Sequence, residues 1–320
     1  METPSEGEIL DVDLVGFETG SAPRRRAVVD GVMRSLATGF VFARHDHDEA
    51  ELSACYATLD AFFALPQVTK DRSIAPDSRG QRGYTGLLVE TAAGSDAADW
   101  KEHLNWGEAL PPNDPLAAAY PDRYAESIFP NDALPGMADQ MMAFHRRTVE
   151  LQRRFLRIVA VGLGAPENYF DAMTERGATL TRAIHYPEMK AAPNTDHVWA
   201  AEHGDINLVT ALPRATAPGL QVKTASGWID ALPPEGYAVL NTGMMLEHVS
   251  NGRLPTGIHR VVAPPDQPGD RLSVVQFCHP TPDTILTPLA SCISHETPQR
   301  YESVVAADWL DEVLREIGLA

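Results

Sequence analysis

Apolar positions along the chain change their spacing near Thr179, and this change divides the predicted secondary structure into two parts. Before it, apolar residues recur every three or four positions in long runs at 23–38, 48–65 and 137–163. That spacing places apolar side chains on one face of a helix. After Thr179 the spacing becomes two, which is typical of half-buried strands, and it continues to about Pro280. The pattern therefore predicts helices followed by a β-rich part.

Shorter runs complete this outline. Strand-like runs stand at 9–14 and 39–44, helix-like runs at 168–175 and 309–317, and residues 67–131 are expected to be irregular with short helices. In the β-rich part, clusters of Pro, Gly and Ser separate strand-like runs at 205–212, 219–222, 227–232 and 237–243. This punctuation is typical of a double-sheet β-barrel and not of alternating βα units.

Composition limits the classes of function that the chain can serve. Its 320 residues and 44% apolar content allow a large core, and the lack of a long linker favours one domain. A net charge of −18 argues against binding nucleic acid or an anionic membrane surface. Three cysteines without a CxxC pair, and no signal peptide or membrane-spanning run, favour a cytoplasmic location. A small molecule is the expected partner, and both a monomer and a dimer are compatible with the sequence.

The pattern with the most chemical content is His203 and Asp205, followed by His259 and then by Arg271 and Ser273. Two imidazoles and one carboxylate form the facial triad of non-haem Fe(II), which leaves positions open for a cosubstrate and O2. Residues i and i+2 of a strand point to the same face, so His203 and Asp205 can reach one metal. His259 arrives from a distant strand, 54 positions later (259 − 205). Arg271 with Ser273 is suited to clamp a carboxylate such as that of 2-oxoglutarate.

Histidine and aspartate two positions apart also occur by chance, and the chain contains a second such run, His-Asp-His-Asp, at 45–48. It stands between a strand-like run at 40–43 and a helix start near Glu49. We interpret it as a turn in which Asp48 caps the helix. Only the later constellation has a second histidine and a carboxylate clamp in order.

A resemblance to a known family rests on a longer series of motifs. They are His-Tyr-Pro at 185–187, Glu-His-Gly-Asp at 202–205, Gly-Leu-Gln-Val at 219–222, Asn-Thr-Gly at 241–243, Ser-Asn-Gly at 250–252, His-Arg-Val at 259–261, Arg-Leu-Ser at 271–273 and Phe-Cys-His-Pro at 277–280. Phe-Phe-Ala-Leu-Pro at 62–66, Arg-Gly-Tyr at 82–84 and Lys-Glu at 101–102 belong to the same series. With these motifs nearly the whole chain resembles the isopenicillin-N-synthase-like family of Fe(II)/2-oxoglutarate-dependent oxygenases, most closely its bacterial members.

The resemblance implies a mainly β fold with flanking helices around a distorted double-stranded β-helix, or jelly roll. It also implies that Fe(II) is bound by His203, Asp205 and His259, and that 2-oxoglutarate is held by Arg271, Ser273 and Tyr186. The implied activity is that of a dioxygenase of secondary metabolism. It would use O2 to hydroxylate an unactivated C–H of a small molecule, such as an amino acid or a secondary-metabolite intermediate, with release of succinate and CO2. Because Asp205 is present, halogenation is not expected.

The same resemblance divides the single oxygenase domain, residues 1–320, into regions. They are an N-terminal helical and strand region at 1–130, a long supporting helix and a following helix at 131–178, the jelly-roll core at 179–282 and a C-terminal segment with a helix at 283–320.

One departure from the family pattern is Met244, which replaces an aspartate that members commonly have after Asn-x-Gly. Met244 either fills space in a loop or reshapes the substrate pocket. The candidates for substrate contact are Asn207, Arg182, His185, Met244, Phe277 and Tyr84. A structural salt bridge is the alternative role of Arg182. Residues 67–110 and the segment after Pro282 are candidates for a lid.

Other functions remain open from the sequence. An Fe(II) oxidase or cyclase would use the same site without 2-oxoglutarate, and a desaturase would use it with a different outcome. A hydrolase or isomerase would need a base near the metal, but Glu202 lies on the opposite face of its strand. A binding or scaffold protein would have no use for an intact triad and a buried arginine, which cost stability when unpaired.

Overall fold

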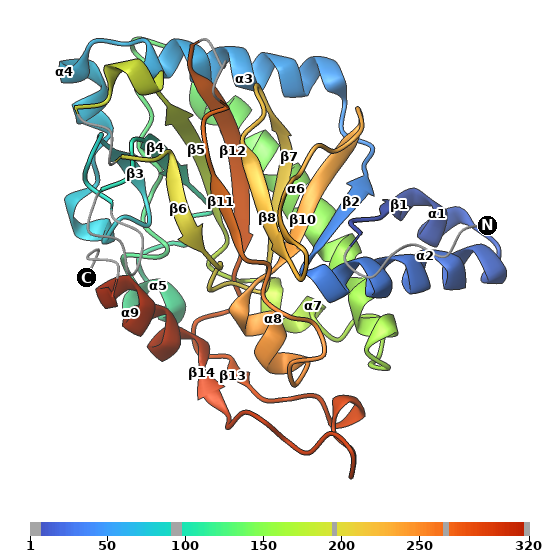
Figure 1. Ribbon diagram of the computed structural model, residues 1–320. Coiled ribbons are helices and arrows are strands. Elements are labelled where there is room, and N and C mark those ends of the chain that lie inside the picture. The colour runs from blue at the N-terminus through green and yellow to red at the C-terminus, as the bar shows by residue number, and fades with distance from the viewer. Residues whose placement is uncertain (1–7, 91–97, 194–196, 265–268, 317–320) are drawn as a thin grey trace.

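Two β-sheets that face each other form the centre of the molecule, and helices cover the outer face of the larger sheet (Figure 1). The computed structural model describes residues 8–90, 98–193, 197–264 and 269–316. The mainly β architecture with flanking helices that the sequence predicts is confirmed.

The larger sheet has eight strands in the order β1-β2-β10-β7-β12-β5-β4-β3, and the smaller has four in the order β6-β11-β8-β9. The strands of the larger sheet are β1 Asp11–Asp13, β2 Phe40–Arg44, β3 Gly83–Thr85, β4 Glu102–Trp106, β5 Leu180–Tyr186, β7 Val209–Ala215, β10 Tyr237–Thr242 and β12 Arg271–Cys278. Those of the smaller sheet are β6 Ala200–His203, β8 Leu220–Thr224, β9 Gly227–Asp230 and β11 His259–Val261. A separate pair consists of β13 Ile285–Leu286 and β14 Val304–Val305. Because the N-terminal and core regions contribute strands to one sheet, we infer that they fold as one unit.

The helices are α1 Leu14–Thr19, α2 Ala22–Ser35, α3 Glu49–Phe63, α4 Gln67–Lys70, α5 Pro115–Ala119, α6 Met137–Gly162, α7 Asp171–Thr174, α8 Met244–Val249 and α9 Ala306–Glu316. At the start of α3, the Asp48 carboxylate accepts hydrogen bonds from the backbone N–H groups of Ala50 (2.8 Å) and Glu51 (3.0 Å). Asp48 is therefore the predicted N-cap, and the His-Asp-His-Asp run is the turn before this helix. Among the described residues, no helix combines the length and apolar character needed to cross a bilayer.

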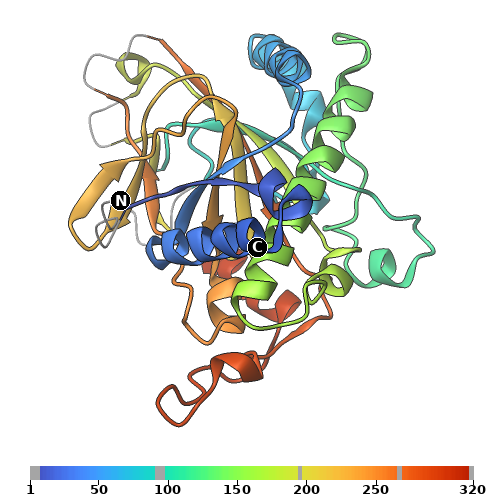
Figure 2. The same cartoon turned by 90° about the vertical axis from the view of Figure 1, so that its right-hand side faces the viewer.

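The long helix α6 packs on the outer face of the larger sheet, with α2 beside it (Figure 2). Its apolar side, including Leu151 and Phe155, lies in one cluster with Val41 and Leu240 of the sheet. The side chains of strand β12 alternate between this core and a cavity on the other face of the sheet. Its residues 272, 274 and 278 are buried in the outer clusters, whereas 271, 273, 275 and 277 line a cavity between the sheets.

Several predicted elements need correction. The strand expected at 9–14 ends at Asp13, because Leu14 begins α1, and the helix expected at 168–175 is only Asp171–Thr174. The region 67–131, expected to be irregular, contributes β3 and β4 to the larger sheet. The strand-like spacing that starts near Thr179 is interrupted by α8. The last residue of the helix expected at 309–317, Ile317, lies outside the described residues.

A buried polar network ties β4 to β5 away from the cavity. Glu102 accepts hydrogen bonds from Lys70 (2.7 Å) and Tyr84, and pairs with His185 Nδ1 (2.8 Å). His185 Nε2 is 2.9 Å from the carboxylate of Asp270. Burial alone would lower the pKa of His185, but the hydrogen bonds to Glu102 and Asp270 outweigh it, so the pKa is raised above 6.5.

This network makes stability depend on pH. A folded-state pKa above the unfolded one stabilises the protein fully below the unfolded pKa of 6.5, and this contribution is lost as pH rises through the folded value. We expect His185→Gln to lower the free energy of unfolding by ~1–2 kcal/mol near pH 6 and by much less near pH 9. Urea unfolding of both proteins at the two pH values measures this. An equal loss at both would contradict the assignment.

Candidate functional site

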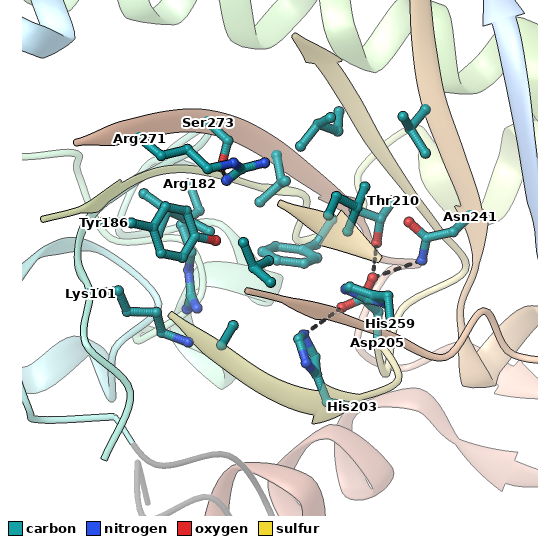
Figure 3. Close-up of a pocket in the computed structure, with 18 of the residues that line it drawn as sticks. Lys101, Arg182, Tyr186, His203, Asp205, Thr210, Asn241, His259, Arg271 and Ser273 are labelled. Carbon is teal, nitrogen blue, oxygen red and sulfur yellow. Dashed lines mark hydrogen bonds and ion pairs between the residues drawn. The ribbon is translucent and has the colours of Figure 1, made fainter. Parts of the chain in front are cut away.

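Three side chains with metal-ligand chemistry meet at the mouth of the cavity between the sheets (Figure 3). His203 is the last residue of β6, Asp205 follows in the loop, and His259 begins β11, directly opposite His203 in the antiparallel pair. One potential ligand atom of each lies within 4.8 Å of the others. Within the described parts of the chain, they are the only such group of three. The three residues that the sequence pattern grouped are therefore also close together in the structure.

Backbone contacts orient both imidazoles. His203 Nδ1 is 2.8 Å from the carbonyl oxygen of Ala201, and His259 Nδ1 is 3.0 Å from that of Gly257. A carbonyl only accepts, so each Nδ1 carries the proton and each Nε2 keeps its lone pair for a metal. Burial, with His259 nearby, lowers the pKa of His203 to about 4, so this ring is neutral at physiological pH.

Asp205 is oriented in the same way through one of its oxygens. Thr210 Oγ1 (2.6 Å) and Asn241 Nδ2 (2.9 Å) both donate to Oδ2. Burial would raise the pKa of this carboxyl, but the two histidines and these hydrogen bonds outweigh it, so the pKa is lowered. The other oxygen, Oδ1, lies 4.0 Å from His203 Nε2 and is available to a metal. Two imidazoles oriented through Nδ1 and one ionised carboxylate therefore fit Fe(II).

The contact from Thr210 gives a prediction. Thr210→Val has nearly the same shape but cannot donate, so Asp205 loses one of the two hydrogen bonds that hold it. Loss of such an outer-shell partner typically weakens metal affinity by roughly 10- to 100-fold, and we expect an effect in this range. Anaerobic titration with Fe(II) measures it, with the exposed Thr287→Val as the matched control. Equal affinities of the two variants would contradict the role given to Thr210.

A close crossing of two backbone segments places His259. Gly39 has φ +82°, and a Cβ there would lie 2.5 Å from Gly257 Cα, so only glycine fits at this point. The Gly257 N–H donates to the Thr242 carbonyl (2.8 Å), while its own carbonyl accepts from His259. The start of β2 thus supports the segment that carries the second imidazole.

The predicted carboxylate clamp lies at the other end of the cavity. Arg271 is 1% exposed and donates to the Ala217 carbonyl and to Ser273 Oγ, both at 3.1 Å. Its guanidinium lies 5.0 Å from the ring centre of Tyr186. In the described part of the chain, no carboxylate lies within 4.0 Å of it, so this buried cation lacks a counterion. Such a site fits an anion.

Two cavities share His203 and Asp205 among their lining residues. A narrow inner one, about 70 Å³, has the triad, Arg271, Ser273 and Tyr186 among its lining residues. A wider outer one, about 480 Å³, extends from His203 and Asp205 to α9. We call them the inner cavity and the chamber.

The structure separates the candidates for substrate contact. Arg182, Phe277 and Met244 line the chamber. His185 and Tyr84 do not: both lie in the network around Glu102. Asn207 is fully buried behind the site, where its side chain donates to Val209 O and Thr210 Oγ1. These three are corrected from substrate contacts to structural residues.

The contacts of Arg182 and Met244 decide between the roles considered for each residue. Arg182 forms the structural salt bridge with Glu90 (3.1 Å) and also lines the chamber. The Met244 backbone N–H donates to the Asp205 carbonyl (2.7 Å), and its side chain reaches the chamber beside Gly204. This favours the reshaped pocket over simple space filling. Glu202 pairs with Lys223 at the rim.

A buried ionic network beside the site was missed from the sequence. Lys101 bridges Glu90 (2.9 Å) and Asp99 (2.7 Å), and Glu90 also binds Arg182. Burial would raise the pKa of Glu90, but Arg182 and Lys101 hold it well below its ordinary value. Asp99 also accepts from the Ala201 N–H (3.2 Å), which anchors the strand of His203. The only signal for these residues was the Lys-Glu motif at 101–102.

Two family models match the chain. The model of the 2OG-Fe(II) oxygenase superfamily matches residues 178–280, and that of the non-haem dioxygenase in morphine synthesis N-terminal region matches residues 12–132. Curated relatives include kihadalactone A synthase LFS of Citrus sinensis, 28% identical over 87% of this chain and 84% of that protein. Another is the 2-oxoglutarate-dependent dioxygenase ecdK of Aspergillus rugulosus, 25% identical over 93% of this chain and 96% of that protein.

Solved structures agree. A crystal structure of a protein assigned to the 2OG-Fe(II) oxygenase family of Caulobacter crescentus matches with a TM-score of 0.84 and 31% identity, over 97% of this chain and 99% of that one. A full-length Neurospora crassa protein, solved in complex with alpha-KG and thymine, matches with a TM-score of 0.84 and 25% identity, over 98% of each chain. These matches confirm the jelly-roll class of the core.

Proposed function

Because the chain belongs to the 2OG-Fe(II) oxygenase superfamily, whose members use Fe(II), 2-oxoglutarate and O2, we propose that it oxidises a small molecule at its His203–Asp205–His259 site. Fe(II) would be held by the two Nε2 atoms and by Asp205 Oδ1. The distal carboxylate of 2-oxoglutarate would lie against Arg271, Ser273 and Tyr186. The observation that carries the proposal is that the triad and the residues around Arg271 line the same inner cavity.

When bound together, Fe(II), 2-oxoglutarate and O2 supply the oxidising chemistry, in which 2-oxoglutarate becomes succinate and CO2 and the substrate C–H becomes C–OH. One oxygen atom of O2 enters succinate and the other enters the alcohol. Hydroxylation is the proposed outcome, and desaturation or ring closure would use the same residues.

The chain's own residues bind, orient and exclude water. The carbonyls of Ala201 and Gly257 fix the imidazole tautomers, and Thr210 with Asn241 directs Asp205. The guanidinium of Arg271 can meet a carboxylate with two charge-assisted hydrogen bonds, in an interior where such bonds are strong. Apolar residues of the two sheets, Phe40, Leu212, Val239 and Val261, line the inner cavity and limit water there.

An Fe(II) oxidase that ignores 2-oxoglutarate would have the same triad. Arg271 is buried and pairs with no carboxylate of the described residues, which favours 2-oxoglutarate, because a cation sequestered from water is costly unless an anion joins it. For the substrate, a small organic molecule is supported by the name of the relative kihadalactone A synthase and by the thymine complex of the Neurospora crassa protein.

The test needs no knowledge of the substrate. Purified enzyme is reconstituted anaerobically with Fe(II) and exposed to O2 with and without 2-oxoglutarate, while succinate and O2 are measured. We expect succinate only when both Fe(II) and 2-oxoglutarate are present. Binding of Fe(II) without any binding or consumption of 2-oxoglutarate would refute the proposal and favour the oxidase.

A further inference from the structure

The chamber has a volume suited to a drug-sized molecule, about 480 Å³. It is lined by His203 and Asp205 at its inner end and by residues of helix α9 on its outer side. Its walls differ in chemistry, and these differences restrict what the chamber can hold.

The charged residues in its inner wall neutralise one another. Lys101 and Arg182 supply two positive charges, and Glu90 and Asp99 supply two negative ones, with contacts of 2.7–3.1 Å. All four carboxylate oxygens already accept: those of Glu90 from Arg182 and Lys101, those of Asp99 from Lys101 and the Ala201 N–H. The wall therefore offers no free carboxylate to an amine and no unmatched cation to an acid.

Two polar side chains that line the chamber nevertheless have a nitrogen without a hydrogen-bond partner among the described residues. Arg182 donates through Nε to Asn105 and through Nη1 to Glu90, and in the described part of the chain its Nη2 has no acceptor. His279 is 5% exposed, and its Nδ1 has no hydrogen-bond partner among the described residues. Burial, with Arg123 nearby, lowers the pKa of His279 to about 3, so the ring is uncharged and offers one donor and one acceptor.

The rest of the chamber is apolar inside and acidic at its rim. The ring centre of Phe277 lies 5.6 Å from the Arg182 guanidinium, and His279 follows Phe277 by two positions, so both side chains face the chamber. Helix α9 adds Trp309, Leu310, Val313 and Leu314. Its exposed Glu312 and Glu316 form an acidic rim that disfavours anions, and Glu202 beside them pairs with Lys223.

Helix α9 is held in this place by ion pairs of its Asp311. The carboxylate binds Arg123 (2.6 Å), which is 2% exposed, and Arg79 (3.0 Å). The helix thus forms a fixed wall of the chamber in this structure.

We infer that the chamber takes an uncharged, largely apolar molecule with a carbonyl or hydroxyl oxygen, anchored by Arg182 Nη2 and by the imidazole of His279. Free amino acids and other carboxylates are excluded, because the charged residues of the wall are already paired with one another and the rim is acidic. This inference rests on the proposed oxygenase function and specifies its substrate class.

The test compares matched acids and neutral analogues by calorimetric titration into enzyme loaded with Fe(II) and 2-oxoglutarate in the absence of O2. The pairs are indole-3-acetate with indole-3-acetamide, 5-carboxyuracil with thymine, and N-acetylphenylalanine with its amide, followed by a larger panel of uncharged carbonyl compounds and free amino acids. We expect neutral members to bind at least about tenfold more tightly, a difference of ~1.4 kcal/mol. Tighter binding of the acids or amino acids, or no binding by any neutral compound, overturns the inference.

Variants test the two anchors with the best neutral ligand. His279→Leu is expected to raise its Kd about tenfold or more, and His279→Gln, which keeps a donor and an acceptor, to restore part of the affinity. Arg182→Lys keeps the charge beside Glu90 but removes Nη2, and should also weaken binding. The exposed His295→Gln and Arg153→Gln are the controls. Equal loss in His279→Leu and His279→Gln, or no loss in any variant, overturns the anchor roles.

Calorimetric binding and succinate formation test the substrate class and the oxygenase proposal separately. Calorimetric binding does not require turnover, so a protein that binds neutral ligands but forms no succinate refutes the oxygenase proposal alone. A protein that forms succinate from 2-oxoglutarate but prefers carboxylate ligands refutes the substrate class alone.

Discussion

Asp205→Asn is expected to lower succinate formation from 2-oxoglutarate by more than about 100-fold, beyond the range that loss of an outer-shell partner produces. The change keeps the shape of the side chain but removes the negative charge from the metal ligand. It also places an amide where Thr210 and Asn241 now donate to one carboxylate oxygen, so the orientation of the group is disturbed. Succinate formation and anaerobic Fe(II) titration measure the two effects.

The control for this prediction is Asp60→Asn, an exposed aspartate on α3 with the same change of charge. It should leave iron affinity and succinate formation unchanged. If Asp205→Asn retained activity within about threefold of the wild type, Asp205 would not be a required ligand and the triad assignment would fail.

Arg271→Leu is expected to raise the KM for 2-oxoglutarate by roughly two orders of magnitude, since removing one partner of a buried charge pair costs about 2–5 kcal/mol. Arg271→Lys should be intermediate, because an ammonium keeps the charge but not the two parallel N–H groups. In the described residues no acid pairs with Arg271, so its removal strands no carboxylate there. The fold should therefore tolerate the change.

A second cosubstrate makes this prediction specific. 2-Oxopentanoate has the 2-oxo acid group of 2-oxoglutarate but lacks the distal carboxylate. The wild type should strongly prefer 2-oxoglutarate, and Arg271→Leu should discriminate little between the two, as in a double-mutant cycle. Arg253→Gln, at an exposed arginine, should keep the wild-type preference. Undiminished preference in Arg271→Leu would remove Arg271 from the carboxylate site.

Local pattern was enough to predict some parts of the fold and not others. Helices α3 and α6 follow from apolar spacing and, for α3, from the cap at Asp48, because these signals lie within a few residues of one another. Strand β4 gave no such signal. All five of its residues are buried, and two of its polar side chains find distant partners: Lys70 for Glu102 and the Gly80 carbonyl for Asn105. Neither alternation nor a turn motif marks a strand of this kind.

The sequence by itself determined the proposed donor set: two histidines and an aspartate for iron, and an arginine with a serine for a carboxylate. The spacing of two between Arg271 and Ser273 follows the geometry of strand β12, which is local, whereas Asp205 lies in the loop after β6. Only the tertiary structure decided the substrate side of the site. It removed His185 and Tyr84 from the cavity, joined Arg182 to Glu90 across 92 positions, and placed α9 over the chamber. Such contacts depend on how distant segments pack, and no short-range pattern of residues encodes that.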